Sequence, residues 1–254
     1  MSTKISFYGF PQPVNRPSPS GYCQKLETFL RATGFTDYTL HTVQPTSAPK
    51  GKLPYIELFK DGEKTDTIAD SHFIVRELIE KGVVPDPDSR LTAAQRADSR
   101  AWQTWTEELL YPVIVYQRWC IPANFYASRS ILPGPWPLQW LLGFYLKRNI
   151  TNAMWANGFG RHSDAERERL VREWVEGLEA RLEGIEFFHG SEPTLIDMIL
   201  CGFLQNAIGQ PGNPEFLKLV LGSERLRKYT AELTRRWFPE YEGVLEVVSK
   251  RHED

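Results

Sequence analysis

The sequence predicts two parts, an α/β part at the N-terminus and an all-α part at the C-terminus. Three observations lead to this prediction. The first 83 residues alternate between strand-like and helical segments, everything after residue 88 has the apolar period of helices, and Pro85 and Pro87 interrupt regular structure between the two. We therefore place a linker at residues 83–88 and expect domains at residues 1–83 and 92–254.

The N-terminal part is expected to contain four strands and two helices. In chain order they are a strand at residues 5–10, a helix at 20–33, strands at 38–43, 55–59 and 64–68, and a helix at 70–81. In the first helix, Cys23, Leu26 and Leu30 recur at i, i+3 and i+7, which predicts one buried face. The other face, with Gln24, Lys25, Thr28 and Arg31, is expected to meet solvent. Asp61-Gly62 is a turn signal between the last two strands.

The C-terminal part shows three apolar stripes at helical spacing, which we expect to form the core. They are Trp102, Trp105, Leu109 and Val113; Val171, Trp174, Val175, Leu178 and Leu182; and Ile196, Ile199, Leu200, Phe203 and Leu204. Pro112 is expected to kink the first of these helices. The apolar segment 136–146 is too short to span a bilayer, which takes roughly twenty apolar residues. We expect it to be a buried helix, with contact to a membrane surface as the alternative.

Composition excludes several classes of protein. Of 254 residues 41% are hydrophobic, which is enough for a packed core, and the formal net charge of −2 gives no electrostatic case for nucleic acid. Three widely spaced cysteines fit neither a disulfide framework nor zinc-ligand spacing, so no metal is expected. A reducing compartment and the absence of an apolar N-terminal signal core predict a cytoplasmic protein without a transmembrane segment.

The segment Ser20-Gly21-Tyr22-Cys23 stands at the first strand-to-helix turn. Thioredoxin-type folds place a reactive sulfur, or the group that activates one, at this turn. Since Ser20 replaces the first thiol of a redox pair, the site is expected to bind and activate the thiol of another molecule. The alternative is that Ser20 only caps the helix. The helical stripe directs Cys23 into the core, where cysteine behaves as a small hydrophobe.

The longer pattern resembles a glutathione transferase. It consists of an α/β half with Gly51-Lys52-Leu53-Pro54-Tyr55-Ile56-Glu57 and Ile68-Ala69-Asp70-Ser71, followed by a helical half with Thr194-Leu195-Ile196-Asp197. Residues 20–31 and 50–74 are most similar to the metaxin and failed-axon-connections branch, and the chain also resembles fungal glutathione transferases of pseurotin or synerazol biosynthesis. The resemblance implies a thioredoxin-like N-terminal domain, an all-α C-terminal domain, glutathione as the thiol cofactor, and a homodimer.

The resemblance also assigns residues to glutathione. Pro54 is expected to be cis, so that the backbone of Leu53 pairs with the cysteinyl part like an added strand. Ser71, at a helix N-terminus, is expected to hold the γ-glutamyl carboxylate, and Asp70 the neighbouring amino group. Lys52, in preference to Lys50, is expected to meet the glycyl carboxylate. Without the family, the same residues read as a strand start, helix caps and surface lysines.

The group that activates the thiol is left open at this stage. Ser20 best matches the serine or cysteine position of the family, Tyr8 resembles the tyrosine used by other classes, and Tyr22 is a third donor. The proline-rich segment 11–19 is longer than the family loop, with Asn15 and Arg16 as further polar groups. Thr194 to Asp197 has the pattern of a capping box and matches a family folding element without a catalytic role.

The second substrate is expected to lie between the two halves. An aromatic lining for a bulky apolar electrophile would come from Tyr8, Phe10, Tyr116, Trp119, Phe125 and Tyr126. The alternative is that these rings belong to the core. The expected activity is addition of the glutathione thiol to the electrophile, or, if glutathione is released again, isomerisation of a double bond in secondary metabolism. The alternative function is that of a metaxin-like interaction protein without catalysis.

Overall fold

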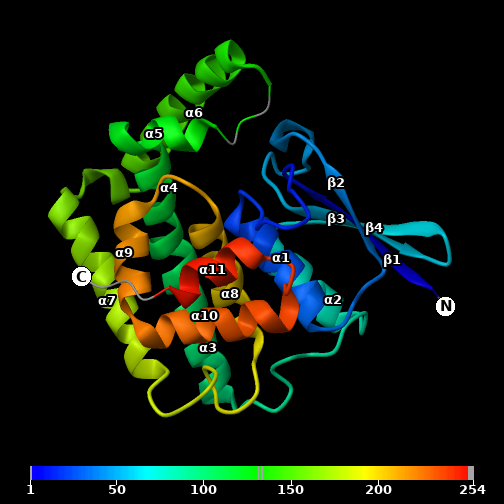
Figure 1. Ribbon diagram of the computed structural model, residues 1–254. Helices are drawn as coiled ribbons and strands as arrows, with labels where there is room; N and C mark the ends of the chain where they lie inside the picture. The colour runs from blue at the N-terminus through cyan, green and yellow to red at the C-terminus, as the bar shows by residue number, and fades with distance from the viewer. Residues whose placement is uncertain (1, 131, 133, 251–254) are drawn as a thin grey trace.

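The computed structural model describes residues 2–130, 132 and 134–250. Four strands form one sheet in the order β2-β1-β3-β4, seen at the right of Figure 1. The strands are β1 (Thr3–Gly9), β2 (Tyr38–Thr42), β3 (Tyr55–Lys60) and β4 (Glu63–Ala69). β1 pairs with β2 in parallel and with β3 antiparallel, and β3 pairs with β4 antiparallel. This is the thioredoxin-like domain that the sequence predicts.

Two helices belong to this domain, α1 (Gly21–Ala32) and α2 (Ser71–Glu80). The predicted strands and helices are confirmed to within two residues at each end, and Asp61 and Gly62 form the expected turn with positive φ angles of 50° and 90°. The connection from β2 to β3 holds only the short 3₁₀ turn η1 (Pro45–Ser47). Therefore no helix of the β2–β3 connection covers the sheet face that points away from α1.

The rest of the described chain is helical, as the sequence predicts. The elements are α3 (Ala93–Trp105), η2 (Thr106–Leu110), α4 (Tyr111–Trp119), α5 (Pro122–Arg129), α6 (Trp136–Ala156), η3 (Phe159–Arg161), α7 (Asp164–Arg181), α8 (Leu195–Gly209), α9 (Pro214–Gly222), α10 (Glu224–Trp237) and α11 (Glu242–Ser249). The second and third predicted stripes are buried, with Trp174, Leu178, Leu200 and Phe203 fully enclosed. Within the described residues no helix is long and apolar enough to cross a membrane.

Pro112 distorts the backbone, although not as a simple bend. α3, η2 and α4 follow one another without interruption, and η2 is a π-helical turn directly before the proline. Proline has no N–H and its ring crowds the preceding turn, and a widened turn is one way for a helix to relieve this. Glu107 belongs to this turn, and its carboxylate pairs with Lys25 of α1.

The two domains meet where α1 crosses α8 (Figure 1). A Cβ atom on Gly202 would lie 2.7 Å from the backbone of Lys25, and one on Gly21 would lie 2.7 Å from the Phe203 ring. Only glycine permits this distance. As a consequence α1 is enclosed by the sheet on one side and α8 on the other, and the expectation of a solvent-facing side is wrong for Gln24, Lys25 and Thr28, each at most 1% exposed.

The expectation that residues 136–146 form a buried helix is also wrong. They begin α6, of which only Gly143 is buried. Figure 1 shows α5 and α6 at the upper end of the molecule, standing away from the sheet. A Cβ on Gly143 would lie 3.2 Å from the Phe125 ring, so α6 packs on α5 along one face and leaves its other face uncovered.

Candidate functional site

Three loops converge at one edge of the sheet. β1 ends beside the start of β3, since Tyr8 pairs with Tyr55, and β4 ends there as well, since Tyr55 pairs with Ala69. Beyond this edge, the N–H of Asp70 donates to the carbonyl of Pro54 (3.3 Å). The segment before α1, the Leu53-Pro54 peptide and the first turn of α2 are therefore neighbours. These are the segments that hold most of the predicted glutathione contacts.

Leu53 and Pro54 have the expected geometry. Their peptide bond is cis, and the Leu53 side chain is buried. Among the described residues, neither the N–H nor the carbonyl of Leu53 has a hydrogen-bond partner. Backbone polar groups in proteins are nearly always paired with protein or water. An extended peptide laid beside Leu53 can satisfy both groups at once.

Asp70 and Ser71 form the entry to α2. Asp70 has φ = 86°, a conformation that non-glycine residues rarely adopt, and its carboxylate accepts a hydrogen bond from the N–H of His72 (2.8 Å). It is thus the N-cap of α2, as the alternative interpretation expected. The N–H and the hydroxyl of Ser71 have no partner among the described residues. They remain available for a ligand carboxylate at the positive end of the helix.

Ser20 is the N-cap of α1. Its hydroxyl oxygen accepts a hydrogen bond from the N–H of Cys23 (3.3 Å), and the residue is 5% exposed. A hydroxyl that accepts a bond still has one hydrogen to donate. Burial raises the pKa of the Cys23 thiol to about 11, although hydrogen bonds from Ser20 and Ser18 act in the opposite direction. Cys23 is therefore a buried thiol, as expected, and its sulfur is one acceptor within reach of the Ser20 hydroxyl.

The structure does not bring Tyr8 or Tyr22 to Ser20. Tyr8 stacks on Tyr55 (4.3 Å between ring centroids) and donates its hydroxyl hydrogen to Glu57 (2.8 Å), on the sheet face opposite α1. Burial and this bond raise the pKa of Tyr8. Tyr22 donates to the backbone carbonyl of Glu107 (3.4 Å). Both hydroxyls therefore already have acceptors within the protein.

Lys50 and Lys52 lie in the exposed loop before Leu53. The Lys50 ammonium lies 4.9 Å from the centroid of the Phe73 ring, in the first turn of α2. Lys52 has no hydrogen-bond or ion-pair partner among the described residues and can reach a carboxylate beside Leu53. Both lysines thus stand near the predicted site, and the structure does not distinguish between them.

The proposed aromatic lining is not assembled in this structure. Trp119 and Phe125 are buried against each other in the helical domain, and Tyr116 packs on Phe159. Phe10 packs partly buried against the core, and Tyr126 is exposed on α5. The rings of Tyr8 and Tyr116 therefore contact partners within their own domains, which is the core role that we considered as the alternative.

Sequence reasoning missed the polar contacts that fix the loop before Ser20. The side chain of Asn206 donates to the carbonyl of Ser18 (2.6 Å), and that of Gln210 donates to the carbonyl of Pro17 (2.7 Å). The N–H of Ser18 donates to the Gln24 side chain (2.7 Å). The proline-rich loop is thereby held on α8. The signal in the sequence is the presence of amides in an otherwise apolar helix.

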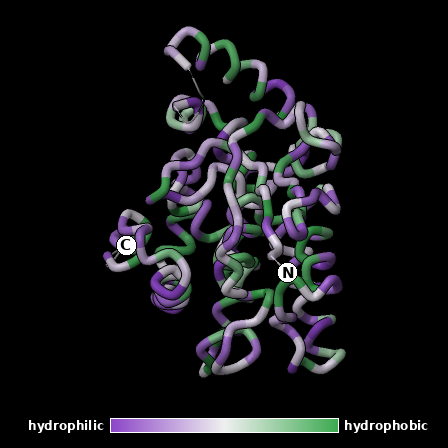
Figure 2. The backbone as a smooth tube through the Cα atoms, turned by 90° about the vertical axis from the view of Figure 1, so that its right-hand side faces the viewer, coloured by the Kyte–Doolittle hydropathy of each residue, from purple (hydrophilic) through white to green (hydrophobic). Residues whose placement is uncertain are grey.

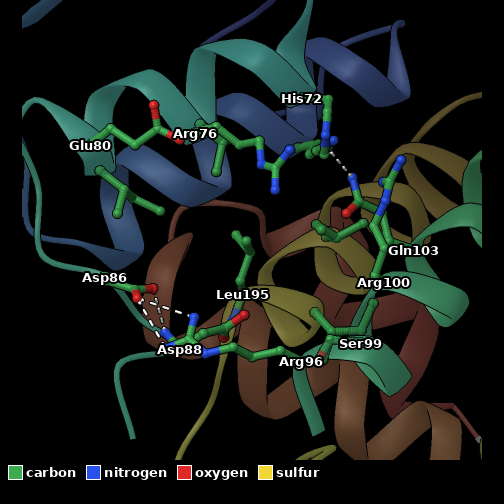
Figure 3. A pocket seen from close by; sticks show the side chains of 15 residues that line it. His72, Arg76, Glu80, Asp86, Asp88, Arg96, Ser99, Arg100, Gln103 and Leu195 are labelled. Carbon is green, nitrogen blue, oxygen red and sulfur yellow. Dashed lines mark hydrogen bonds and ion pairs between the residues drawn. The ribbon is translucent and has the colours of Figure 1, made fainter. Parts of the chain in front are cut away.

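A cavity of about 260 Å³ lies between α2 and α3, close to the first turn of α2 (Figure 3). His72 and Arg76 line it from α2, and Gln103 from α3, with Gln103 within 3.3 Å of the His72 ring nitrogen Nδ1. Gln103 also donates to Glu107, which pairs with Lys25. Sequence reasoning did not predict this chain of polar side chains between the two domains.

The sheet order, the cis peptide and the following helical domain define a glutathione transferase fold. Residues 21–124 match the family model of the glutathione S-transferase N-terminal domain. A maleylacetoacetate isomerase from Anaeromyxobacter dehalogenans 2CP-1, solved with glutathione in its active site, is similar in structure with a TM-score of 0.54 and 17% identity, covering 100% of this chain and 98% of that one. The predicted fold class and the resemblance to this superfamily are confirmed.

Relatives in sequence include failed axon connections and the metaxins. Failed axon connections of Drosophila melanogaster is 33% identical over 211 residues, which are 77% of this chain and 48% of that protein. Metaxin-2 of Homo sapiens is 23% identical over 195 residues, 75% of this chain and 72% of the relative. The chain spans about half the length of failed axon connections. The resemblance to the metaxin and failed-axon-connections branch is thus confirmed.

Proposed function

We propose that the protein binds glutathione at the sheet edge and activates its thiol for addition to a bulky apolar electrophile. The observation that carries this proposal is the unpaired backbone of Leu53 beside cis-Pro54, next to the unpaired N–H and hydroxyl of Ser71. The backbone pairs with the cysteinyl part, and Ser71 holds the γ-glutamyl carboxylate. Asp70 then accepts a hydrogen bond from the amino group of glutathione. Lys52 pairs with the glycyl carboxylate.

Ser20 has the activating role in this proposal. A thiol with an ordinary pKa near 8.5 is mostly protonated at neutral pH. The Ser20 hydroxyl donates a hydrogen bond that stabilises the thiolate, and the N-terminus of α1 favours the same negative charge. Glutathione supplies the nucleophilic sulfur. If the adduct rotates and expels the sulfur again, the same residues serve a cis/trans isomerisation, as in secondary metabolism.

The test compares Ser71→Ala, Ser20→Ala and a control, Ser163→Ala, which removes the N-cap of α7 far from the site. Calorimetry is expected to show glutathione affinity weakened by roughly 1–3 kcal/mol in Ser71→Ala, because a charge-assisted hydrogen bond is lost. The ultraviolet absorbance of bound thiolate is expected to show a pKa raised by about one to two units in Ser20→Ala. Ser163→Ala is expected to change neither measurement.

The outcomes separate the parts of the proposal. Unchanged affinity in a folded Ser71→Ala variant removes Ser71 from the site, and an unmoved thiolate curve in Ser20→Ala removes Ser20 from activation. If the parent protein does not bind glutathione, the alternative is favoured: an interaction protein similar to the metaxins, which the sequence relatives support. Homodimerisation and a cytoplasmic location remain predictions.

A further inference from the structure

The α5–α6 hairpin carries most of the exposed large hydrophobic side chains. Eight of the eleven such side chains in the described residues belong to these two helices. Six of them form what we call the aromatic tip: Tyr126, Trp136, Trp140, Leu141, Phe144 and Tyr145, each 44–67% exposed. Figure 2 shows hydrophobic stretches, in green, at the upper end of the molecule where this hairpin lies.

Three rings of the tip, those of Trp140, Phe144 and Tyr126, are linked through the buried ring of Phe125. Trp140 and Phe144 lie 4.4 Å apart between ring centroids, Phe144 lies 5.4 Å from Phe125, and Phe125 lies 5.9 Å from Tyr126. The exposed apolar residues of α6 lie mainly in its first half, whereas Asn149, Thr151 and Asn152 face solvent in its second half. The exposed apolar side chains are therefore concentrated in the first half of α6, and Trp155 near its C-terminal end is the exception.

The segment that contains α5 and α6 carries positive charges and no negative ones. Glu108 is followed by no acidic residue before Asp164, although 32 of the 254 residues are acidic. Arg129, Lys147 and Arg148 border the tip, and the described residues provide no carboxylate within ion-pair distance of them. The ammonium of Lys147 lies 5.0 Å from the Phe125 ring centroid and the guanidinium of Arg129 lies 5.2 Å from the Tyr126 ring centroid. Two of the basic side chains therefore lie against aromatic rings of the hairpin.

We propose that the aromatic tip is a membrane-contact surface that inserts into the interface of an anionic lipid bilayer. Tryptophan and tyrosine prefer the headgroup level, where one end of the ring is apolar and the other is hydrated. The basic residues meet lipid phosphates, and the lack of acidic side chains removes the repulsion that an anionic surface would otherwise impose. Because no described helix spans a membrane, the contact is peripheral. This inference is independent of the glutathione site.

Charge favours lipid over a second copy of this chain as the occupant. Two tips placed together would bring Arg129, Lys147 and Arg148 of one copy against the same basic residues of the other, and among the described residues no carboxylate forms an ion pair with them. A closed two-fold interface repeats the same patch on both sides. An anionic bilayer, in contrast, presents the complementary charge.

The experiment measures co-sedimentation of the full chain with phosphatidylcholine vesicles that either contain or lack phosphatidylglycerol. We expect binding to the anionic vesicles that weakens with added salt, and much weaker binding to pure phosphatidylcholine. The variant Trp136→Ser/Trp140→Ser/Leu141→Ser is expected to bind at least about tenfold more weakly, because the inserted apolar area is lost. The control Val14→Ser/Phe73→Ser/Ile185→Ser removes three exposed apolar side chains elsewhere and is expected to bind like the parent.

A second pair of variants tests the charge. Lys147→Gln/Arg148→Gln is expected to weaken binding to anionic vesicles by about thirty-fold, whereas Arg169→Gln/Arg172→Gln, with the same change in net charge on α7, is expected to leave it nearly unchanged. Equal losses in both charge variants, or no binding by the parent, overturn the proposal. So does an oligomer, seen by light scattering without vesicles, that dissociates in the tip variant, since the tip would then be an interface between copies.

Discussion

Replacement of Lys25 by methionine is expected to destabilise the folded protein by about 3–5 kcal/mol. The Lys25 ammonium lies 2.5 Å from the Glu107 carboxylate, and the two side chains are 2% and 10% exposed. Lys25→Met leaves Glu107 as a buried charge whose remaining bond comes from the neutral side chain of Gln103 (3.0 Å). Urea unfolding followed by circular dichroism measures the loss. The effect is large because the Glu107 charge is then buried without a partner of opposite charge.

The control for this prediction is the exposed ion pair of Lys228 and Glu224, whose side chains are 77% and 69% exposed. Lys228→Met is expected to cost less than about 1 kcal/mol. In the double variant Lys25→Met/Glu107→Leu no unpaired charge remains, and most of the lost stability is expected to return. A double variant as unstable as Lys25→Met would show that packing, and not charge pairing, determines the effect.

Lys25 also shows where prediction from the sequence ends. The period of Cys23, Leu26 and Leu30 correctly gave the helix and the side that packs on the sheet. It assigned Gln24, Lys25 and Thr28 to solvent, since a polar stripe normally marks an exposed face. Their burial depends on Gly202 and Gly21, which let α8 approach α1 closely from the other side. Hydrophobic periodicity records local amphipathicity and carries no information about such a distant contact.

The same limit explains the results for the candidate site. The cis peptide of Leu53 and Pro54 and the helix start at Asp70 and Ser71 were predictable, because each depends on a local signal whose spacing matches the family. Their contacts with glutathione stay a prediction. The positions of the aromatic rings were not predictable, because Trp119, Phe125 and Tyr116 are placed by packing between helices that are far apart in the chain. α6 misled the prediction for a physical reason as well. An apolar segment is usually buried by other parts of its own chain. The sequence pattern does not show whether another helix covers the segment, and in α6 one face stays exposed.

Asp197→Ala is the second substitution for which we expect a large effect, again about 3–5 kcal/mol of unfolding free energy. The fully buried carboxylate accepts four hydrogen bonds of 2.7–2.8 Å, from the N–H and hydroxyl of Thr194, the N–H of Phe188 and the hydroxyl of Tyr229. These donors belong to the loop before α8, to the N-cap of α8 itself and to α10. The predicted capping box therefore exists, and it extends to two further elements.

The chain contains a matched control for this prediction, the capping box of Ser163 and Glu166 at the start of α7. Glu166 makes the equivalent bonds to the N–H and hydroxyl of Ser163, but at the surface, where water replaces a lost acceptor. Glu166→Ala is therefore expected to cost only a small fraction of the Asp197→Ala effect. If thermal and urea unfolding give similar losses for both variants, the contribution of Asp197 is local helix capping alone. A much larger loss in Asp197→Ala shows that the buried donors on Phe188 and Tyr229 need this carboxylate.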